Sequence, residues 1–317
     1  MSDRSTMPAR IVAGTAHPGL AAAVAAALGV RPVPCEVERF PDGELRPVVS
    51  GVQGGDVYVV QPTGPAVNDH LVEALLLLDA CRRGGAETVT AVLPYFGYAR
   101  QDRRGRAGQA VGAKVVLGAL ASAGADRLIV VEPHTVALEA MCPVPVEMLT
   151  AVPILAEELA ELTSETAVLV APDLGAVKLA EHCARLLRRP VAVVRKTRVS
   201  GARVHAEELV GDVRDRPAVI VDDMISTGGT IEAAVRVLLA HGASPDITVA
   251  AAHGPLVDAA RDRLGRLPIR CLLVTDTLPA GGAREPRTRV RSVAPLIADA
   301  IGRLHNGQSL DSLMVRG

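Results

Sequence analysis

From end to end, the chain alternates between short apolar segments and Ala- and Leu-rich segments with helical period. The apolar segments have four to six residues, the length of strands that are buried on both faces of a parallel sheet. The expected strands are 10–13, 56–61, 88–93, 127–131, 167–171, 191–194, 218–221, 247–251 and 271–274. The expected helices are 19–28, 68–82, 112–122, 151–162, 175–187, 230–241 and 255–264. Because single helices join consecutive strands, the pattern predicts an α/β fold, in two domains that meet near residue 150.

Composition narrows the class of protein. Net charge is −1 and charged residues make up 22 %, so overall charge favours neither a nucleic acid nor a membrane surface as a partner. No apolar run approaches the roughly 20 residues of a membrane-spanning helix. The five cysteines are scattered and form no CxxC pair, which favours neither a disulfide framework nor a zinc site. We therefore expect a soluble cytoplasmic protein without a nucleic-acid or membrane partner.

The most informative segment is AVIVDDMISTGGT at residues 218–230. An apolar strand ends in Asp222 and Asp223, and a loop of small and hydroxyl residues then leads into a helix. Thr227 or Gly228 is expected to cap this helix, and Asn68 is expected to cap helix 68–82. Glycines let the backbone approach an anion closely, and the first turn of a helix points its N–H groups at that anion. The loop residues expected to hold a phosphate are Ser226, Thr227, Gly228, Gly229 and Thr230. Carboxylates that can accept hydrogen bonds from sugar hydroxyls lie beside a loop that can bind phosphate. This combination favours a binding site for a phosphorylated pentose over an ordinary helix cap.

This segment resembles the loop that binds phosphoribosyl diphosphate in type I phosphoribosyltransferases and in ribose-phosphate diphosphokinases. Five further motifs match the diphosphokinases in order and spacing, over nearly the whole chain. They are FPDGE (40–44), PYFGYARQDR (94–103), AGADRLIVVEPH (123–134), APDLGAVKLA (171–180) and SVAPLIADAIGRLH (292–305). The resemblance implies two phosphoribosyltransferase-like domains, 9–149 on the ATP side and 150–305 on the ribose 5-phosphate side, each with a mainly parallel sheet flanked by helices.

The same resemblance implies an activity and its residues. Diphosphate would pass from ATP to the anomeric hydroxyl of ribose 5-phosphate, with Mg²⁺ as cofactor, in a homo-oligomer whose active site lies at a subunit interface. Arg100, Gln101 and Asp102 follow a ring-rich stretch and are expected to bind ATP. A neighbouring subunit would add Phe40, Asp42 and Glu44 to the adenine pocket. The remaining residues implied are His134 (ATP and metal), Asp173 (metal) and the catalytic pair Lys196 and Arg198.

Three positions depart from the family's pattern and keep alternatives open. Glu132 stands where the family usually has Asp, Thr197 where it often has Arg, and Ser226 where it often has Asp. One alternative is a catalytically weak paralogue that regulates an active synthetase by co-assembly. Another is a diphosphokinase for a different phosphorylated sugar. A single-domain-type phosphoribosyltransferase is a third, and would use a base instead of ATP as co-substrate.

Overall fold

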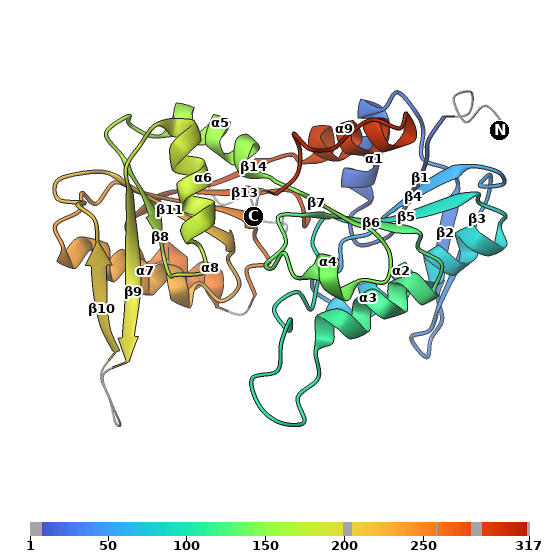
Figure 1. Ribbon diagram of the computed structural model, residues 1–317, viewed down its shortest axis with the longest axis horizontal. Coiled ribbons are helices and arrows are strands. Elements are labelled where there is room, and N and C mark those ends of the chain that lie inside the picture. The colour runs from blue at the N-terminus through green and yellow to red at the C-terminus, as the bar shows by residue number, and fades with distance from the viewer. Residues whose placement is uncertain (1–7, 199–204, 258, 280–286, 316–317) are drawn as a thin grey trace. The chain divides into compact units, whose positions relative to one another are not determined.

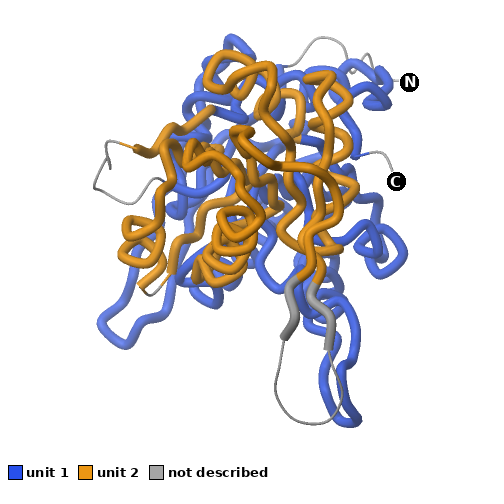
Figure 2. Tube along the Cα trace, turned by 90° about the vertical axis from the view of Figure 1, so that its left-hand side faces the viewer, with its two compact units in different colours: residues 1–150, 277–279, 292–317 blue, residues 151–276, 280–291 orange. Residues whose placement is uncertain are grey.

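The computed structural model describes residues 8–198, 205–257, 259–279 and 287–315, and the side chains of 196–198 and 205–207 lie outside that description. The chain divides into two compact units (Figures 1 and 2). Unit 1 comprises residues 1–150, 277–279 and 292–317, and unit 2 comprises residues 151–276 and 280–291. Among the described residues, no helix is long and apolar enough to cross a membrane.

Unit 1 is built on a five-stranded parallel sheet in the order β1-β4-β5-β6-β7. Its elements are β1 (Arg10–Ala13), α1 (Pro18–Ala27), β2 (Cys35–Arg39), β3 (Leu45–Val49), β4 (Asp56–Val60), α2 (Val67–Arg83), β5 (Thr88–Leu93), α3 (Gly112–Ser122), β6 (Arg127–Val131), α4 (Leu138–Met141), β7 (Val146–Leu149) and α9 (Ala294–His305). Figure 1 shows α1 and α9 on one face of this sheet and α2 and α3 on the other. The strands are therefore apolar on both faces: Val57 and Val59 face the core under α2 and α3, and the alternating Tyr58 is buried as well.

Unit 2 is built on a seven-stranded sheet in the order β10-β9-β8-β11-β12-β13-β14, in which only β10 is antiparallel to its neighbour. Its elements are α5 (Val152–Leu162), β8 (Val168–Ala171), α6 (Val177–Leu187), β9 (Val191–Arg198), β10 (His205–Val210), β11 (Ala218–Met224), α7 (Gly229–Ala240), β12 (Ile247–His253), α8 (Ala260–Gly265), β13 (Ile269–Thr275) and β14 (Thr288–Arg291). Alternation along β11 sends Ile220 into the core beside α7, and Val219 into the core beside α5 and α6.

The expected α/β class with mainly parallel sheets is confirmed, and so are the expected strands, with shifts at their ends. Three expectations about helices need correction. Asn68 does not cap α2, because the helix begins at Val67 and the Asn68 Oδ1 atom accepts a hydrogen bond from the Tyr98 hydroxyl at 2.5 Å. α8 begins at Ala260, because residues 254–257 are not helical. The C-terminal helix α9, assigned to the second domain from sequence, packs against α1 in unit 1.

Candidate active site

Two carboxylates end β11, the strand that lies between β8 and β12 and runs parallel to both. Asp222 and Asp223 are half-buried. The Asp222 Oδ1 atom accepts a hydrogen bond from the Asp223 N–H at 2.9 Å, and Asp223 Oδ1 accepts one from the Met224 N–H at 2.8 Å. The carboxyl ends of parallel strands are where α/β sheets bind ligands. Both carboxylates therefore lie at the carboxyl end of the strand, where the sequence predicted them.

A third carboxylate, that of Asp173, lies in the loop after β8, the strand beside β11. Its Oδ1 atom accepts hydrogen bonds from the N–H groups of Gly175 at 2.9 Å and Ala176 at 3.3 Å. Burial, followed by the nearby negative charges of Asp223 and Asp173, raises the pKa of Asp222 from 3.8 to about 8. Asp173, Asp222 and Asp223 thus form one acidic group within unit 2.

Replacing Asp222 by asparagine is expected to change how the stability of the protein depends on pH. Between about pH 4 and pH 8 the folded state holds a proton on Asp222 that the unfolded state has lost, so the free energy of unfolding falls as pH rises through this window. The asparagine side chain cannot ionise. The variant should match the wild type near pH 4 and exceed its unfolding free energy at pH 8 by several kcal/mol, on the order of 1.4 kcal/mol for each unit by which the pKa of Asp222 is raised. Urea unfolding in EDTA at both pH values measures the difference.

Asp262→Asn is the matched control, because Asp262 is an exposed carboxylate of the same unit. This control should keep the wild-type dependence on pH. Parallel pH profiles for Asp222→Asn and the wild type would show that burial does not hold Asp222 protonated.

The segment from Ser226 to Thr230 runs from the turn after β11 into α7, whose first two residues are Gly229 and Thr230. Gly228 is the N-cap residue of α7 and has a φ of 76°, which confirms one of the two expected caps. Among the described residues, no side chain caps this helix. Thr227 is exposed, Gly228 is buried, and Ser226, Gly229 and Thr230 are half-buried. A glycine with positive φ at the start of a 12-residue helix gives the loop the backbone form that anion-binding loops use.

The predicted ATP residues of unit 1 lie in the long loop between β5 and α3. Arg100 and Gln101 are exposed, and the Asp102 side chain is 17 % exposed, 3.6 Å from the Arg103 guanidinium. The Gln101 N–H donates to the Tyr98 carbonyl at 2.8 Å. The ring-rich stretch before these residues does not form one exposed surface, because its Phe96 is 4 % exposed and belongs to the core.

His134 lies in the loop after β6 and is exposed. Two residues earlier, Glu132 is 6 % exposed and has a φ of 39°. Its Oε2 atom accepts a hydrogen bond from the Thr150 hydroxyl at 2.9 Å. Glu132, whose side chain is longer than that of Asp, is therefore held by Thr150, the residue that follows β7. His134 is exposed to solvent.

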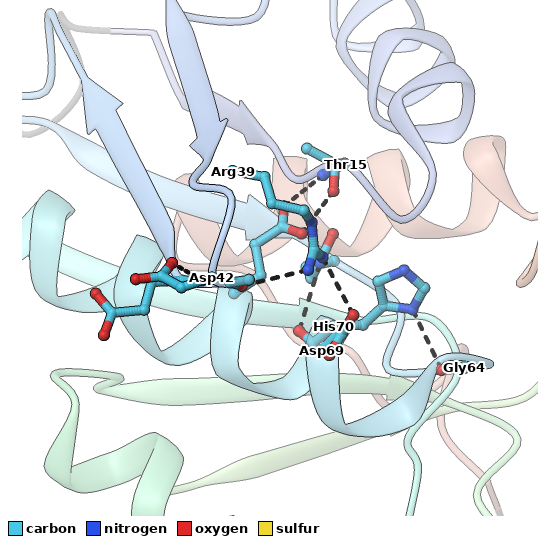
Figure 3. A network of polar contacts seen from close by, with 10 residues as sticks. Thr15, Arg39, Asp42, Gly64, Asp69 and His70 are labelled. Carbon is cyan, nitrogen blue, oxygen red and sulfur yellow. Dashed lines mark hydrogen bonds and ion pairs between the residues drawn. The ribbon is translucent and has the colours of Figure 1, made fainter.

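Phe40, Asp42 and Glu44 lie on the turn of the β2–β3 hairpin, which packs against α2 of the same unit. Phe40 is half-buried and Asp42 and Glu44 are exposed, and the Arg46 guanidinium lies 5.1 Å from the centre of the Phe40 ring. Figure 3 shows how Arg39 holds this turn. Its guanidinium donates to the Gly43 carbonyl at 3.3 Å and to the Asp69 carboxylate of α2 at 3.1 Å. The turn is thus fixed at its base and exposed at its tip.

Lys196 and Arg198 lie at the end of β9, where their backbones pair with Glu207 and His205 of β10. Their side chains and the loop of residues 199–204 lie outside the described residues. The catalytic roles of this pair remain predictions.

Sequence reasoning missed a residue that reaches the site from elsewhere in the chain. Arg263 of α8 donates from Nη1 to the Thr227 carbonyl at 2.6 Å, and its Nε lies 3.2 Å from the Glu232 carboxylate. Arg263 and Thr227 are remote in sequence, so no local spacing reveals their contact.

A strand-to-helix glycine loop beside paired carboxylates is typical of α/β proteins that bind phosphorylated ligands. The model of the N-terminal domain of ribose phosphate pyrophosphokinase matches residues 9–124, and that of the phosphoribosyl synthetase-associated domain matches residues 202–315. This chain therefore belongs to the ribose-phosphate pyrophosphokinase family, as its motifs indicated.

Individual relatives are similar in sequence to this chain along almost its whole length. The ribose-phosphate pyrophosphokinase of Gloeobacter violaceus is 40 % identical over 307 residues, which are 96 % of this chain and 92 % of that protein. The one from Streptomyces avermitilis is 38 % identical over 305 residues, with 95 % and 94 % coverage. The crystal structure of phosphoribosylpyrophosphate synthetase from Mycobacterium smegmatis matches with a TM-score of 0.87 and 37 % identity, over 95 % of this chain and 100 % of that one.

Proposed function

We propose that this chain transfers the β,γ-diphosphoryl group of ATP to the anomeric hydroxyl of ribose 5-phosphate, giving 5-phosphoribosyl 1-diphosphate and AMP. The observation that carries the proposal is the carboxyl end of β11, in a chain of the pyrophosphokinase family. There, Asp222 and Asp223 stand immediately before a glycine loop that opens α7. Carboxylates accept hydrogen bonds from sugar hydroxyls, and the loop N–H groups donate to a phosphate.

On the sugar side, the loop from Ser226 to Thr230 binds the 5-phosphate, and Asp222 and Asp223 hold the ribose hydroxyls. On the nucleotide side, Arg100 and Gln101 contact ATP, with Asp102 and His134 beside them. Both arginine and glutamine are exposed and can reach a ligand. The ribose hydroxyl attacks the β-phosphorus in line, so the chain contributes mainly positioning and charge stabilisation.

Mg²⁺ is the proposed cofactor, and the acidic group of unit 2 fits it. Burial and the neighbouring charges of Asp223 and Asp173 hold the pKa of Asp222 high, so a cation at this site would favour the ionised form of Asp222. In the described part of the chain, no three His, Cys, Asp or Glu side chains converge as a metal-binding group. Mg²⁺ is usually held by one or two carboxylates together with substrate phosphates. Asp173 is the proposed ligand in unit 2 and His134 the proposed ligand in unit 1, and Mg²⁺ would neutralise charge on the transferred diphosphate.

Release of AMP from ATP by the purified chain tests this function and its alternatives. AMP should appear only when Mg²⁺ and ribose 5-phosphate are both present. A regulatory paralogue would release none alone but would change the rate of an added active synthetase. A panel of phosphorylated sugars would reveal a diphosphokinase with another preferred substrate. A base that replaces ATP as co-substrate would indicate a phosphoribosyltransferase.

We also propose that the active site is shared between subunits, and a mixture of two inactive variants tests it. Phe40→Ala removes the aromatic tip of the β2–β3 hairpin, and Lys196→Ala removes the catalytic cation. Each parent should be nearly inactive. After subunit exchange at equal amounts, about a quarter of the sites should combine an intact hairpin with an intact Lys196. AMP release should recover accordingly.

Subunit exchange must be shown independently, for example by energy transfer between labelled subunits. The matched control mixes Phe40→Ala with a Phe40→Ala/Lys196→Ala double variant, which should recover nothing. If exchange is complete and the two complementary variants stay inactive together, the hairpin serves its own chain.

A further inference from the structure

Arg263 of α8 reaches the loop that joins β11 to α7. Its Nη1 atom donates to the Thr227 carbonyl oxygen at 2.6 Å. Its Nε atom lies 3.2 Å from Glu232, in the first turn of α7, and Glu232 also pairs with Arg236. A planar guanidinium bound at two of its nitrogens has little freedom to rotate. The direction of the Thr227 carbonyl is therefore set from outside the loop.

The direction of that carbonyl also decides where the next N–H points. In a planar trans peptide, the C=O and the following N–H point in opposite directions. With the Thr227 carbonyl directed at Arg263, the Gly228 N–H points away from Arg263. The φ of Gly228, 76°, belongs to this orientation. Reversing the peptide would bring φ to a negative value, as in the change from a type II to a type I turn.

Glycine makes both orientations accessible, because it has no Cβ to penalise either sign of φ. A loop with a glycine at this position can thus lose one of its anion-binding N–H groups by a local rotation of one peptide. The hydrogen bond from Arg263 opposes that rotation, since its charged donor would be left without the Thr227 oxygen.

We propose that Arg263 is a positioning residue of the phosphate loop. It fixes the peptide between Thr227 and Gly228 so that the Gly228 N–H faces the 5-phosphate of the sugar substrate, and Glu232 holds Arg263 in place. This inference rests on the proposed function of the loop. Arg263 acts through the peptide and need not touch the substrate.

Nuclear magnetic resonance of protein labelled with ¹⁵N-glycine tests the inference in the wild type. On titration with ribose 5-phosphate, the Gly228 amide proton should move downfield, as expected for a new hydrogen bond to phosphate. If no loop amide responds although the enzyme turns over this sugar, the loop does not bind the phosphate and the proposed role of the loop fails. If Gly229 responds and Gly228 does not, the loop binds the phosphate but the inference about Arg263 is wrong.

Variants then separate positioning from simple support of the fold. Arg263→Met should raise the KM for ribose 5-phosphate roughly tenfold, the loss of about one hydrogen bond to a charged group. The kcat and the KM for ATP should stay within about twofold. Arg236→Met is the matched control, because it also removes a cation from Glu232 but makes no described contact with the loop. Arg263→Lys keeps a charged donor and should restore part of the affinity.

Two kinetic results would also overturn the proposal. One is an unchanged KM for ribose 5-phosphate in Arg263→Met, and the other is an equal rise in Arg263→Met and Arg236→Met. If Arg263→Met does not fold, Arg263→Lys and the Gly228 resonance of the wild type decide between the same outcomes.

Discussion

Alanine in place of Lys196 is expected to lower turnover by about 10²–10³-fold, with KM values for ATP and ribose 5-phosphate changed far less. Lysine carries a compact point charge, which suits a group that stabilises negative charge as the diphosphate is transferred. Such a charge contributes mainly in the transition state, so its loss appears in kcat. Steady-state AMP release at varied concentrations of each substrate measures the changes in kcat and in the two KM values separately.

Lys178→Ala is the matched control, because the chain has only three lysines and Lys178 is exposed on α6 in the same unit. This variant should keep wild-type kinetics. Near wild-type turnover in Lys196→Ala would show that Lys196 takes no part in catalysis. A loss confined to KM would make it a binding group.

The sequence predicted the elements whose pattern is set by burial on two faces. β11 is one example, because Val219 and Ile220 enter different cores and both must be apolar. The β2–β3 hairpin was missed for the opposite reason. Its outward residues include Glu36, Glu38 and Arg46, and its inward residues are only partly buried against α2. A pattern of that kind is shared by many exposed loops.

Edge strands were missed because their formation depends on a neighbour that is distant in sequence. β14 (Thr288–Arg291) pairs with β13 on one side only, and its exposed Arg289 and Val290 carry no alternation that marks a strand. β7, at the edge of the other sheet, also depends on partners distant in sequence, because it pairs with β6 and its Leu149 bridges to Met314 near the C-terminus. Four-residue strands at an edge are defined by their partner more than by their own composition.

The candidate site likewise has a part that could be predicted from the sequence and a part that could not. Residues that are consecutive in the chain, from Asp222 to Thr230, could be grouped from sequence, because one strand, one loop and one helix carry them. The approach of Asp173 to Asp222 requires the pairing of β8 with β11. The hydrogen bond from Arg263 to Thr227 requires the packing of α8 against α7. These contacts follow from tertiary structure, which one sequence does not encode in a local pattern.

Valine at position 228 is expected to weaken ribose 5-phosphate binding by about 100-fold or more and to spare ATP binding. A β-branched residue is strongly disfavoured at the φ of 76° that Gly228 adopts. Its Cβ would also lie 3.3 Å from Leu264 of α8. The loop must then change its backbone, which removes N–H groups from the phosphate. Isothermal titration calorimetry with each ligand measures the two affinities.

Gly242→Val separates this effect from general strain. Gly242 follows the C-terminal end of α7 and has a φ of 81°, and a Cβ there would meet Arg214 Cγ at 3.6 Å. The backbone penalty is comparable, but the residue lies at the opposite end of the helix from the phosphate loop. Gly242→Val should therefore lose stability and keep its affinity for ribose 5-phosphate. An equal loss of affinity for ATP and ribose 5-phosphate in Gly228→Val would point to misfolding. An unchanged affinity for ribose 5-phosphate would show that this loop does not bind the phosphate.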